Sequence, residues 1–259
     1  MSNSRLSLCL LALLPGVCVA DDVGIHFGSE YYSWNEYDNG RHLLEENGPR
    51  FFVGIDANNY RDLWQYTLSG RLYTGRVSYD GQTQIGTPHS TDTDYNGFDA
   101  ELTFARRLDT GSPTPSNWSL LFSAGYNGWR RNIRDANGVA GYVEDYQIGY
   151  GRLGLLYRGD SQWTAQVGVK RPFYTTEQVG LSRFGYDDPT LSPAPLPSLY
   201  ASFNYPLNRD WGLLGYYDSF EFDKSHTEAL TIGGVPVGTV YQPQSSYQTI
   251  GIGLRYQLK

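Results

Sequence analysis

Hydrophobic and polar residues alternate along most of the chain, and the C-terminal segment shows the pattern most clearly. From 249 to 258, one set of alternate positions is apolar and the other is polar or glycine; the apolar set is Ile250, Ile252, Leu254, Tyr256 and Leu258. A period of two places the sets on opposite faces of a β-strand. In a soluble sheet the apolar face would be buried, whereas in a membrane barrel it would face lipid and the polar face would line the interior.

The same alternation recurs often enough to predict about ten strands, with eight or twelve as alternatives. Each clear segment approaches the roughly 9–11 residues that a tilted strand needs to cross a bilayer. The clearest segments are 51–57, 98–104, 118–126, 163–169 and 199–205.

Three segments alternate less cleanly, and a miscount of the strands would arise in two of them, 25–37 and 142–158. In 64–78 the apolar phase slips near Thr74, which suggests a β-bulge. Segment 142–158 keeps its phase only in part. The first strand, 25–37, contains several aromatic residues without a clear phase, so its faces are not assigned from the sequence.

The connectors between these segments differ in length. Short turns at one end and long polar loops at the other are typical of outer-membrane barrels, in which the short turns lie in the periplasm. The short connectors are 58–62, 158–162 and 207–210, with 109–117 as a longer exception, and the expected long loops are 38–48, 80–96, 132–141, 174–197 and 223–245.

Aromatic residues cluster beside the short connectors. Four of the six tryptophans directly follow one, and three tyrosines end the strands that return to the same level. An aromatic ring with a polar edge suits the boundary between hydrocarbon and headgroups. We therefore predict an aromatic girdle made of Trp64, Trp118, Trp163, Trp211, Tyr157, Tyr205 and Tyr256.

Composition and the N-terminus support an exported β protein. Aromatic residues make up 15% of the chain, with 30 Gly and a single Met, which suits strands and turns. Residues 1–20 are typical of a signal peptide, and 21–259 would form the barrel. Their removal takes away both cysteines and Arg5, which leaves 19 Lys and Arg against 27 Asp and Glu, a net charge of −8. That charge argues against nucleic acid as a partner, and no later apolar run is long enough for a transmembrane helix.

The ending Gly253-x-x-Tyr256-x-Leu258 resembles the C-terminal insertion signal of bacterial outer-membrane barrels, although Lys259 follows where that family usually ends on an aromatic residue. The resemblance to small outer-membrane β-barrel proteins covers Asp21 to Lys259. It implies an all-β, closed antiparallel transmembrane barrel in the outer membrane of a Gram-negative bacterium. It also implies contact with the lipid bilayer and lipopolysaccharide, insertion by the barrel assembly machinery through the last strand, and a monomer.

Charged residues recur on the predicted inward faces. A barrel of about ten strands is narrow, and unpaired charges inside it would be costly, so we expect acid–base pairs across the lumen. Such a network either fills and stabilises the barrel or lines a narrow channel for small polar solutes. Its predicted members are Asp56, Arg71, Asp99, Glu101, Arg152, Lys170 and Arg255, with Arg131 near the outer end.

The stretch from Asp92 to Gly97 copies the front half of an EF-hand calcium loop, with Asp92, Asp94 and Asn96 as oxygen ligands. The twelfth position is Thr103 rather than glutamate, which favours an ordinary polar loop. The strand and loop layout also resembles the ten-stranded omptin proteases, but no Asp-x-His sequence of that family occurs here. We therefore assign no catalytic residue, metal or cofactor.

These observations favour a non-catalytic outer-membrane barrel with a surface-binding or envelope-structural role. A narrow, porin-like channel is the alternative, and an omptin-like protease is a weaker one.

Overall fold

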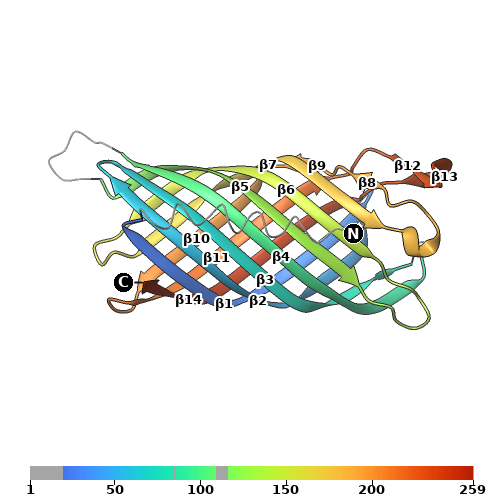
Figure 1. Cartoon of the computed structure of the whole chain (residues 1–259), viewed down its shortest axis with the longest axis horizontal. Coiled ribbons are helices and arrows are strands. Elements are labelled where there is room, and N and C mark those ends of the chain that lie inside the picture. Colours follow the sequence, from blue (N-terminus) through green and yellow to red (C-terminus); the bar gives the residue numbers. More distant parts are fainter. Residues whose placement is uncertain (1–19, 84–85, 109–115, 259) are drawn as a thin grey trace.

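Ten long antiparallel strands close on themselves in the computed structural model, which describes residues 20–83, 86–108 and 116–258 (Figure 1). Strand β14 pairs with both β1 and β11, and β10 pairs with β7 across a long connector, so the sheet has no open edge. The predicted ten-stranded barrel is confirmed. Its strands are β1 (Asp22–Asp38), β2 (Arg41–Arg61), β3 (Trp64–Gln82), β4 (Pro88–Arg107), β5 (Trp118–Ile133), β6 (Val143–Arg158), β7 (Thr164–Gly180), β10 (Ser198–Pro206), β11 (Trp211–Asp223) and β14 (Gln244–Leu258).

Smaller elements lie in two connectors at one end of the barrel. The β7–β10 connector contains the 3₁₀ turn η1 (Ser182–Phe184), β8 (Thr190–Leu191) and β9 (Ala194–Leu196), and β12 (Glu228–Ile232) and β13 (Val235–Val240) form a separate hairpin between β11 and β14. Within the described ranges, no helix is long and apolar enough to cross a membrane. The predicted signal peptide, 1–20, lies outside the described residues apart from Ala20.

Several strands are much longer than a bilayer requires. Strands β2, β3 and β4 contain 21, 19 and 20 residues. The expected long loops at 38–48 and 80–96 are therefore wrong in extent: Asn39-Gly40 alone joins β1 to β2, with φ of 51° and 79°. Positive φ at both central residues is the signature of a tight hairpin turn. These segments resembled loops in the sequence because their outer face is polar.

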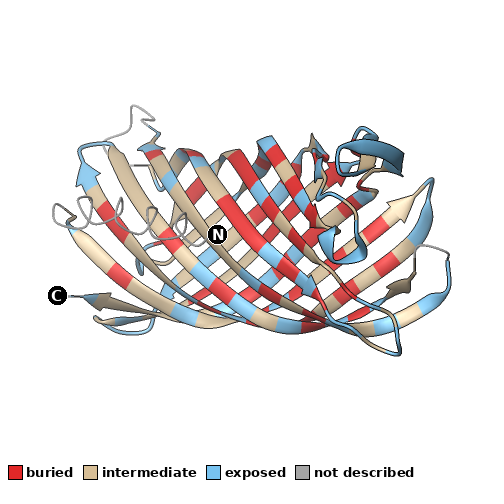
Figure 2. Cartoon of the chain, turned by 45° about the vertical axis from the view of Figure 1, so that its right-hand side comes forward, coloured by how far each residue is buried: buried red, intermediate tan, exposed pale blue. Residues whose placement is uncertain are grey.

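The barrel wall divides into two halves of opposite polarity. We call the part between the short connectors and the level of Leu72 on β3 the lower half, and the part beyond it the upper half. In the lower half the outward side chains are apolar and exposed, as with Ile252 (60% exposed). In the upper half the apolar side chains point inward, as with Trp129 (3% exposed) and Tyr95 (0%). Figure 2 shows the resulting alternation of buried and exposed positions along the strands.

Strand β3 shows the change within one element. Leu72 is 45% exposed on the outside, whereas Tyr73 and Val77 are buried on the inside. Pairing with β2 and β4 keeps one register across this point, so the predicted bulge near Thr74 is wrong. The apolar residues change face along this strand, while the strand register continues unaltered.

Strand β1, whose faces the sequence left open, follows the same rule. Its outward Phe27 and Tyr31 are exposed, and its inward Glu30, Tyr32 and Trp34 are buried. The inward face of β1 therefore carries both charge and aromatic rings into the lumen.

Candidate functional site: the barrel lumen

Aromatic side chains fill the lumen of the upper half. Trp129 stacks on Tyr146 with ring centroids 4.8 Å apart, and Tyr32 lies 4.7 Å from Tyr95. The remaining members pack around these rings and are almost wholly buried. They include Trp34, Tyr73, Tyr79, Ile133, Ile148, Tyr150, Phe220, Phe222 and Tyr247. The upper half thus has a packed core like that of a soluble protein.

Arg131 sits within this core among glutamates. Its guanidinium lies 2.5 Å from Glu144, 3.0 Å from Glu46 and 3.3 Å from Glu36, and Glu177 is also fully buried nearby. Burial raises the pKa of Glu144 to about 7, although Arg131 favours its charged form. Burial also raises the pKa of Glu177, and the charges of Glu144 and Glu36 add to that effect. The cluster thus contains several glutamates around a single arginine, which is why their charged forms are not all balanced by a cation.

A second buried arginine marks the base of the core. Arg50 lies 2.5 Å from Glu30 and donates a hydrogen bond to the hydroxyl of Tyr247. Its guanidinium carbon is 4.1 Å from the ring centre of Tyr32 and 4.5 Å from that of Tyr73. Ion pairing and cation–π contact together hold this charge where water is excluded.

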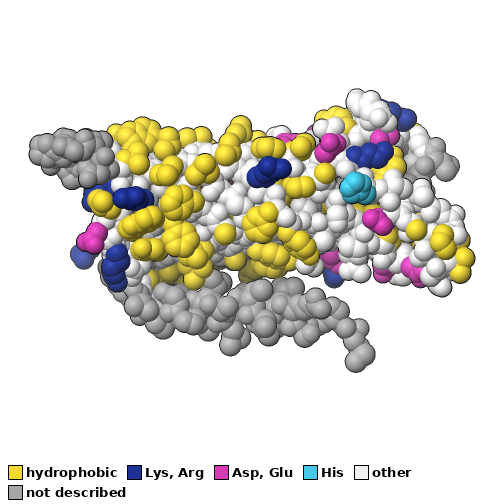
Figure 3. All heavy atoms as spheres, turned by 90° about the horizontal axis from the view of Figure 1, so that it is seen from above, with side chains coloured by type: hydrophobic (Ala, Val, Ile, Leu, Met, Phe, Trp, Pro, Cys, Tyr) yellow, Lys and Arg dark blue, Asp and Glu magenta, His cyan; other side chains and the backbone are white. Residues whose placement is uncertain are grey.

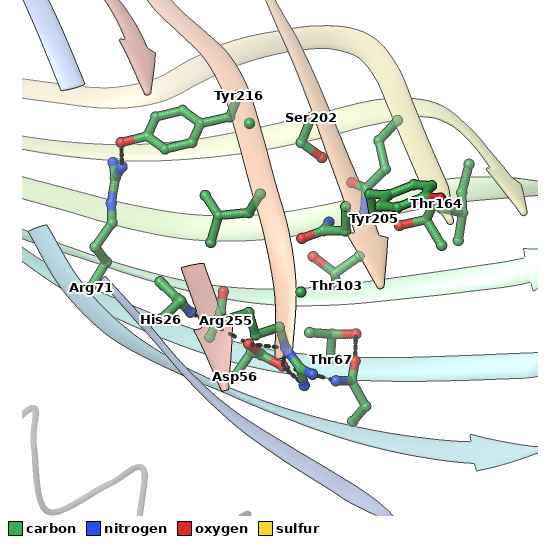
Figure 4. Close-up of a pocket in the computed structure, with 18 of the residues that line it drawn as sticks. His26, Asp56, Thr67, Arg71, Thr103, Thr164, Ser202, Tyr205, Tyr216 and Arg255 are labelled. Atoms are coloured by element: carbon green, nitrogen blue, oxygen red, sulfur yellow. Dashed lines mark hydrogen bonds and ion pairs between the residues drawn. The ribbon is translucent and has the colours of Figure 1, made fainter. Parts of the chain in front are cut away.

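The lower half contains a cavity of about 560 Å³ that reaches the short turns. Gln162 and Arg209, in two of those turns, line its mouth, and Arg71 and Tyr216 lie at its inner end (Figure 4). The hydroxyl of Tyr216 donates to Glu30, and Arg71 bonds to both groups. The cavity therefore ends where the aromatic core begins.

The structure brings the predicted lumen charges into three groups. Arg255 lies 2.7 Å from Asp56, which His26 also approaches (Figure 4), and 3.1 Å from Asp22. Arg71 lies 2.7 Å from Asp99 and also pairs with Glu30.

The third group lies on β4, β6, β7 and β11. Arg152 bridges Glu101 at 3.0 Å and Asp218 at 2.8 Å. Lys170 is 2.7 Å from Asp218, and its ammonium nitrogen is 3.3 Å from the ring centre of Phe220. All seven predicted charges thus face the interior within ion pairs.

Sequence reasoning missed the partners of these charges: Asp22, Glu30 and Asp218, and the buried acids Glu36, Glu46, Glu144 and Glu177. The signal was present in part. Once the phase of β1 is known, Glu30 and Glu36 fall on the face of Tyr32 and Trp34.

The predicted girdle residues lie beside the short connectors. Trp118 contacts Tyr157, which also contacts Trp163, with ring centroids 4.8 and 5.1 Å apart. Trp211 contacts Tyr256 at 4.9 Å. Trp64 stacks on Tyr66, and Tyr205 stacks on Phe203. Figure 3 shows apolar side chains covering much of the wall toward this end of the barrel.

The weak calcium candidate does not form a loop. Asp92, Asp94 and Asn96 occupy alternate positions on β4, facing out of the barrel, and the expectation of a polar loop there is wrong. The carboxylate of Asp94 is paired with Arg76 at 2.7 Å and Arg134 at 3.5 Å. Among the residues that the structure describes, no cluster of three or more acidic, His or Cys residues is arranged to hold a metal ion.

Comparison with known proteins identifies the fold. No protein-family model and no curated protein matches the sequence. The structure is similar to the outer membrane protease OmpT from Escherichia coli, with a TM-score of 0.52 and 12% identity over 93% of this chain and 98% of that one. It also matches the translocator domain of the autotransporter NalP from Neisseria meningitidis (TM-score 0.43, 13% identity, 98% and 95% covered) and Ail of Yersinia pestis (0.39, 11%, 92% and 98%).

The chain has the outer-membrane β-barrel fold. At this level of identity the likeness concerns the fold alone, and that fold is consistent with a location in the cell outer membrane.

Proposed function

We propose that this protein is a filled, non-conducting and non-catalytic outer-membrane barrel whose upper half projects from the membrane as a rigid column that presents a binding surface. The observation that carries the proposal is the packed upper lumen, where Trp34, Tyr95 and Tyr247 are fully buried together with Arg131. A pore needs a continuous path, and the cavity of the lower half ends below this core.

The outward apolar rows of the lower half would contact the bilayer and lipopolysaccharide. The short connectors would then lie in the periplasm, where both ends of the barrel, at Asp22 and Leu258, also meet. A monomer inserted by the barrel assembly machinery accords with a sheet closed within one chain. The polar exterior of the upper half suits water outside the cell.

No observation favours the two alternatives. A channel for small polar solutes would need the aromatic core to open. An omptin-like protease would need acidic side chains at the barrel mouth, whereas Asp92 and Asp94 lie on the outer wall and Asp94 is held by arginines. The OmpT likeness supplies no catalytic group.

Planar-bilayer recording of the purified, folded protein tests the absence of conduction. We expect no discrete current steps. Folding is checked in the same preparation by the shift in gel mobility between boiled and unboiled samples. Steps from protein that passes this check would overturn the proposal.

Orientation is tested by a membrane-impermeant amine reagent on intact cells. Lys224 is exposed at the end with long connectors, whereas Lys170 is fully buried. We expect labelling of the wild type and loss of labelling in Lys224→Arg. Labelling that appears only after the cells are permeabilised would contradict the proposed orientation.

A further inference from the structure

Two walls of the lower cavity differ in whether their polar side chains have hydrogen-bond or ion-pair partners within the protein. On β1, β2, β3, β4, β6 and β14, the charged groups that line the cavity are paired with one another, except Arg158. The amides there are also engaged, since the carbonyl oxygen of Asn58 accepts hydrogen bonds from Gln65 and Thr67. Arg158, near the mouth, donates to the side-chain oxygen of Gln65. This wall offers few groups to a ligand.

The opposite wall, on β7 and β10, carries uncharged groups without partners. Thr164 and Gln166 lie beside Asn204 and Ser202 in register, and all four line the cavity. They face inward because their neighbours Val167 and Phe203 are exposed on the outside. None of these four side chains makes a hydrogen bond with another residue in the described part of the chain. Figure 4 shows Thr164 and Ser202 on strands apart from those that carry Asp56 and Arg255.

Aromatic rings complete the inner end of the cavity. Phe52, Tyr150, Tyr200 and Tyr216 all line it, and the first three are almost wholly buried. A volume of about 560 Å³ falls within the range of roughly 300–1,000 Å³ typical of small-molecule sites. The cavity therefore combines ring faces, free hydroxyl and amide groups, and an entrance at the short turns.

We propose that this cavity binds a small neutral polyhydroxylated solute, a polyol or a mono- or disaccharide. Such a ligand matches side chains that both donate and accept hydrogen bonds. Facing positions on paired strands are about 5 Å apart and alternate positions on one strand about 7 Å apart, which suits the hydroxyls of one or two sugar rings. Arg71, Arg152 and Arg255 already pair with carboxylates, so an anionic solute among them would have to break an ion pair and leave a partner unpaired in a narrow lumen. Arg158, which has no carboxylate partner among the described residues, lies nearer the mouth.

The proposed contacts with the ligand follow from the positions of these side chains along the cavity wall. The amides of Gln166 and Asn204 would each exchange two hydrogen bonds with ligand hydroxyls, and the hydroxyls of Thr164 and Ser202 would supply one or two more. The rings of Tyr216 and Phe52 would meet the apolar face of the sugar. Solute binding in this cavity does not depend on the proposed surface-binding role of the upper half. The experiment below measures solute binding independently of that role.

The test uses titration calorimetry on the full folded barrel in lauryldimethylamine oxide, a detergent without a sugar headgroup. Glycerol and lactose are the neutral probes, and lactobionate, the acid related to lactose, is the charged one. We expect saturable binding of at least one neutral probe at one site per barrel, and at least tenfold weaker binding of lactobionate than of lactose. Absence of saturable binding by both neutral probes, or tighter binding of lactobionate, would overturn the proposal.

Two near-isosteric variants provide a matched pair. Thr164→Val removes a free hydroxyl, whereas Thr103→Val removes one that already donates to Glu101 in the same cavity. We expect Thr164→Val to weaken binding of the neutral probe by fivefold or more and Thr103→Val by less than twofold.

The double variant Gln166→Leu/Asn204→Leu should abolish binding while the gel-mobility shift shows a folded barrel. Equal effects of the two threonine variants, or binding retained by a folded double variant, would contradict the assignment of this wall. Should the double variant not fold, the threonine pair alone decides.

Discussion

The lower and upper halves of this barrel share one backbone pattern and use it in opposite ways. In the lower half, Val53 and Ile252 point outward and charged pairs such as Arg255–Asp56 lie inside. In the upper half, Trp129 and Tyr95 point inward, and the exposed Arg130–Asp145 pair lies outside. A strand offers two faces, and the medium outside the wall decides which face is apolar. On the proposed function, the level at which the faces exchange marks the edge of the membrane.

The largest expected effect concerns the core of the upper half. Arg131→Met leaves Glu36, Glu46 and Glu144 buried without their cation. We expect this change to lower the free energy of unfolding by about 3–5 kcal/mol. The neighbouring Arg130 faces outward, is exposed, and pairs with Asp145. Arg130→Met should therefore cost less than about 1 kcal/mol. Urea unfolding in detergent measures both, and similar losses would contradict opposite facing of these adjacent residues.

A charge placed on the lipid face should have a strong effect only in the lower half. Ile252→Arg is expected to lower the stability of the barrel in lipid by about 2–4 kcal/mol. Gln248→Arg lies on the same face of β14, four residues farther into the upper half, and should change stability by less than about 0.5 kcal/mol. Reversible unfolding in lipid vesicles compares them. A large cost at Gln248 would move the membrane edge above that level.

The acidic cluster makes the upper half pH-dependent. Because burial raises the pKa of Glu144 from its ordinary value of 4.5 to about 7, the folded chain binds more protons than the unfolded chain between these values. Stability should therefore fall as the pH rises through this window, by about 1–3 kcal/mol between pH 5 and pH 8. Urea midpoints across this range measure the slope, and Glu144→Gln should reduce it. A stability that rises with pH would refute this description of the cluster.

The smallest expected effect lies outside the barrel wall. Asp187 binds the turn of the β12–β13 hairpin, accepting hydrogen bonds from the backbone N–H groups of Gly233 and Gly234 and from the hydroxyl of Thr231. Asp187→Ala should speed hydrogen exchange at these glycines and change global stability by less than about 0.5 kcal/mol. Exchange measured by mass spectrometry tests this, with Asp188→Ala as the control. Unchanged exchange would show that the hairpin is held by other contacts.

The fold was predictable from the sequence because a membrane strand shows its alternation locally. In segments such as 163–169 and 250–258, the alternation predicts which side chains of the lower half point outward. The girdle tryptophans predict that these strands begin or end at the same depth. The upper half was not predictable in the same way. Its outward side chains, such as Arg76 and Asp94, are polar as in a loop. The sequence therefore predicts loops at 38–48 and 80–96, although the strands continue through 41–48 and 88–96.

The partners in the lumen were beyond reach of the sequence for a different reason. Arg71 on β3 meets Glu30 on β1, and Lys170 on β7 meets Asp218 on β11. Such pairs depend on strand register and on how the sheet closes, which no local pattern records. The group of side chains without partners that includes Gln166 and Asn204 likewise forms only because β7 and β10 lie side by side, which the sequence does not show.

The exchange of faces along β3 is tested most directly by single cysteines, since the only two in the chain, Cys9 and Cys18, precede the barrel. Spin labels at Leu72→Cys and Arg76→Cys in lipid vesicles should collide mainly with dissolved oxygen and with a water-soluble nickel complex, respectively. Val77→Cys should resist a water-soluble maleimide until the protein is unfolded. A nickel-accessible label at 72, or a freely reactive thiol at 77 in the folded barrel, would contradict the account.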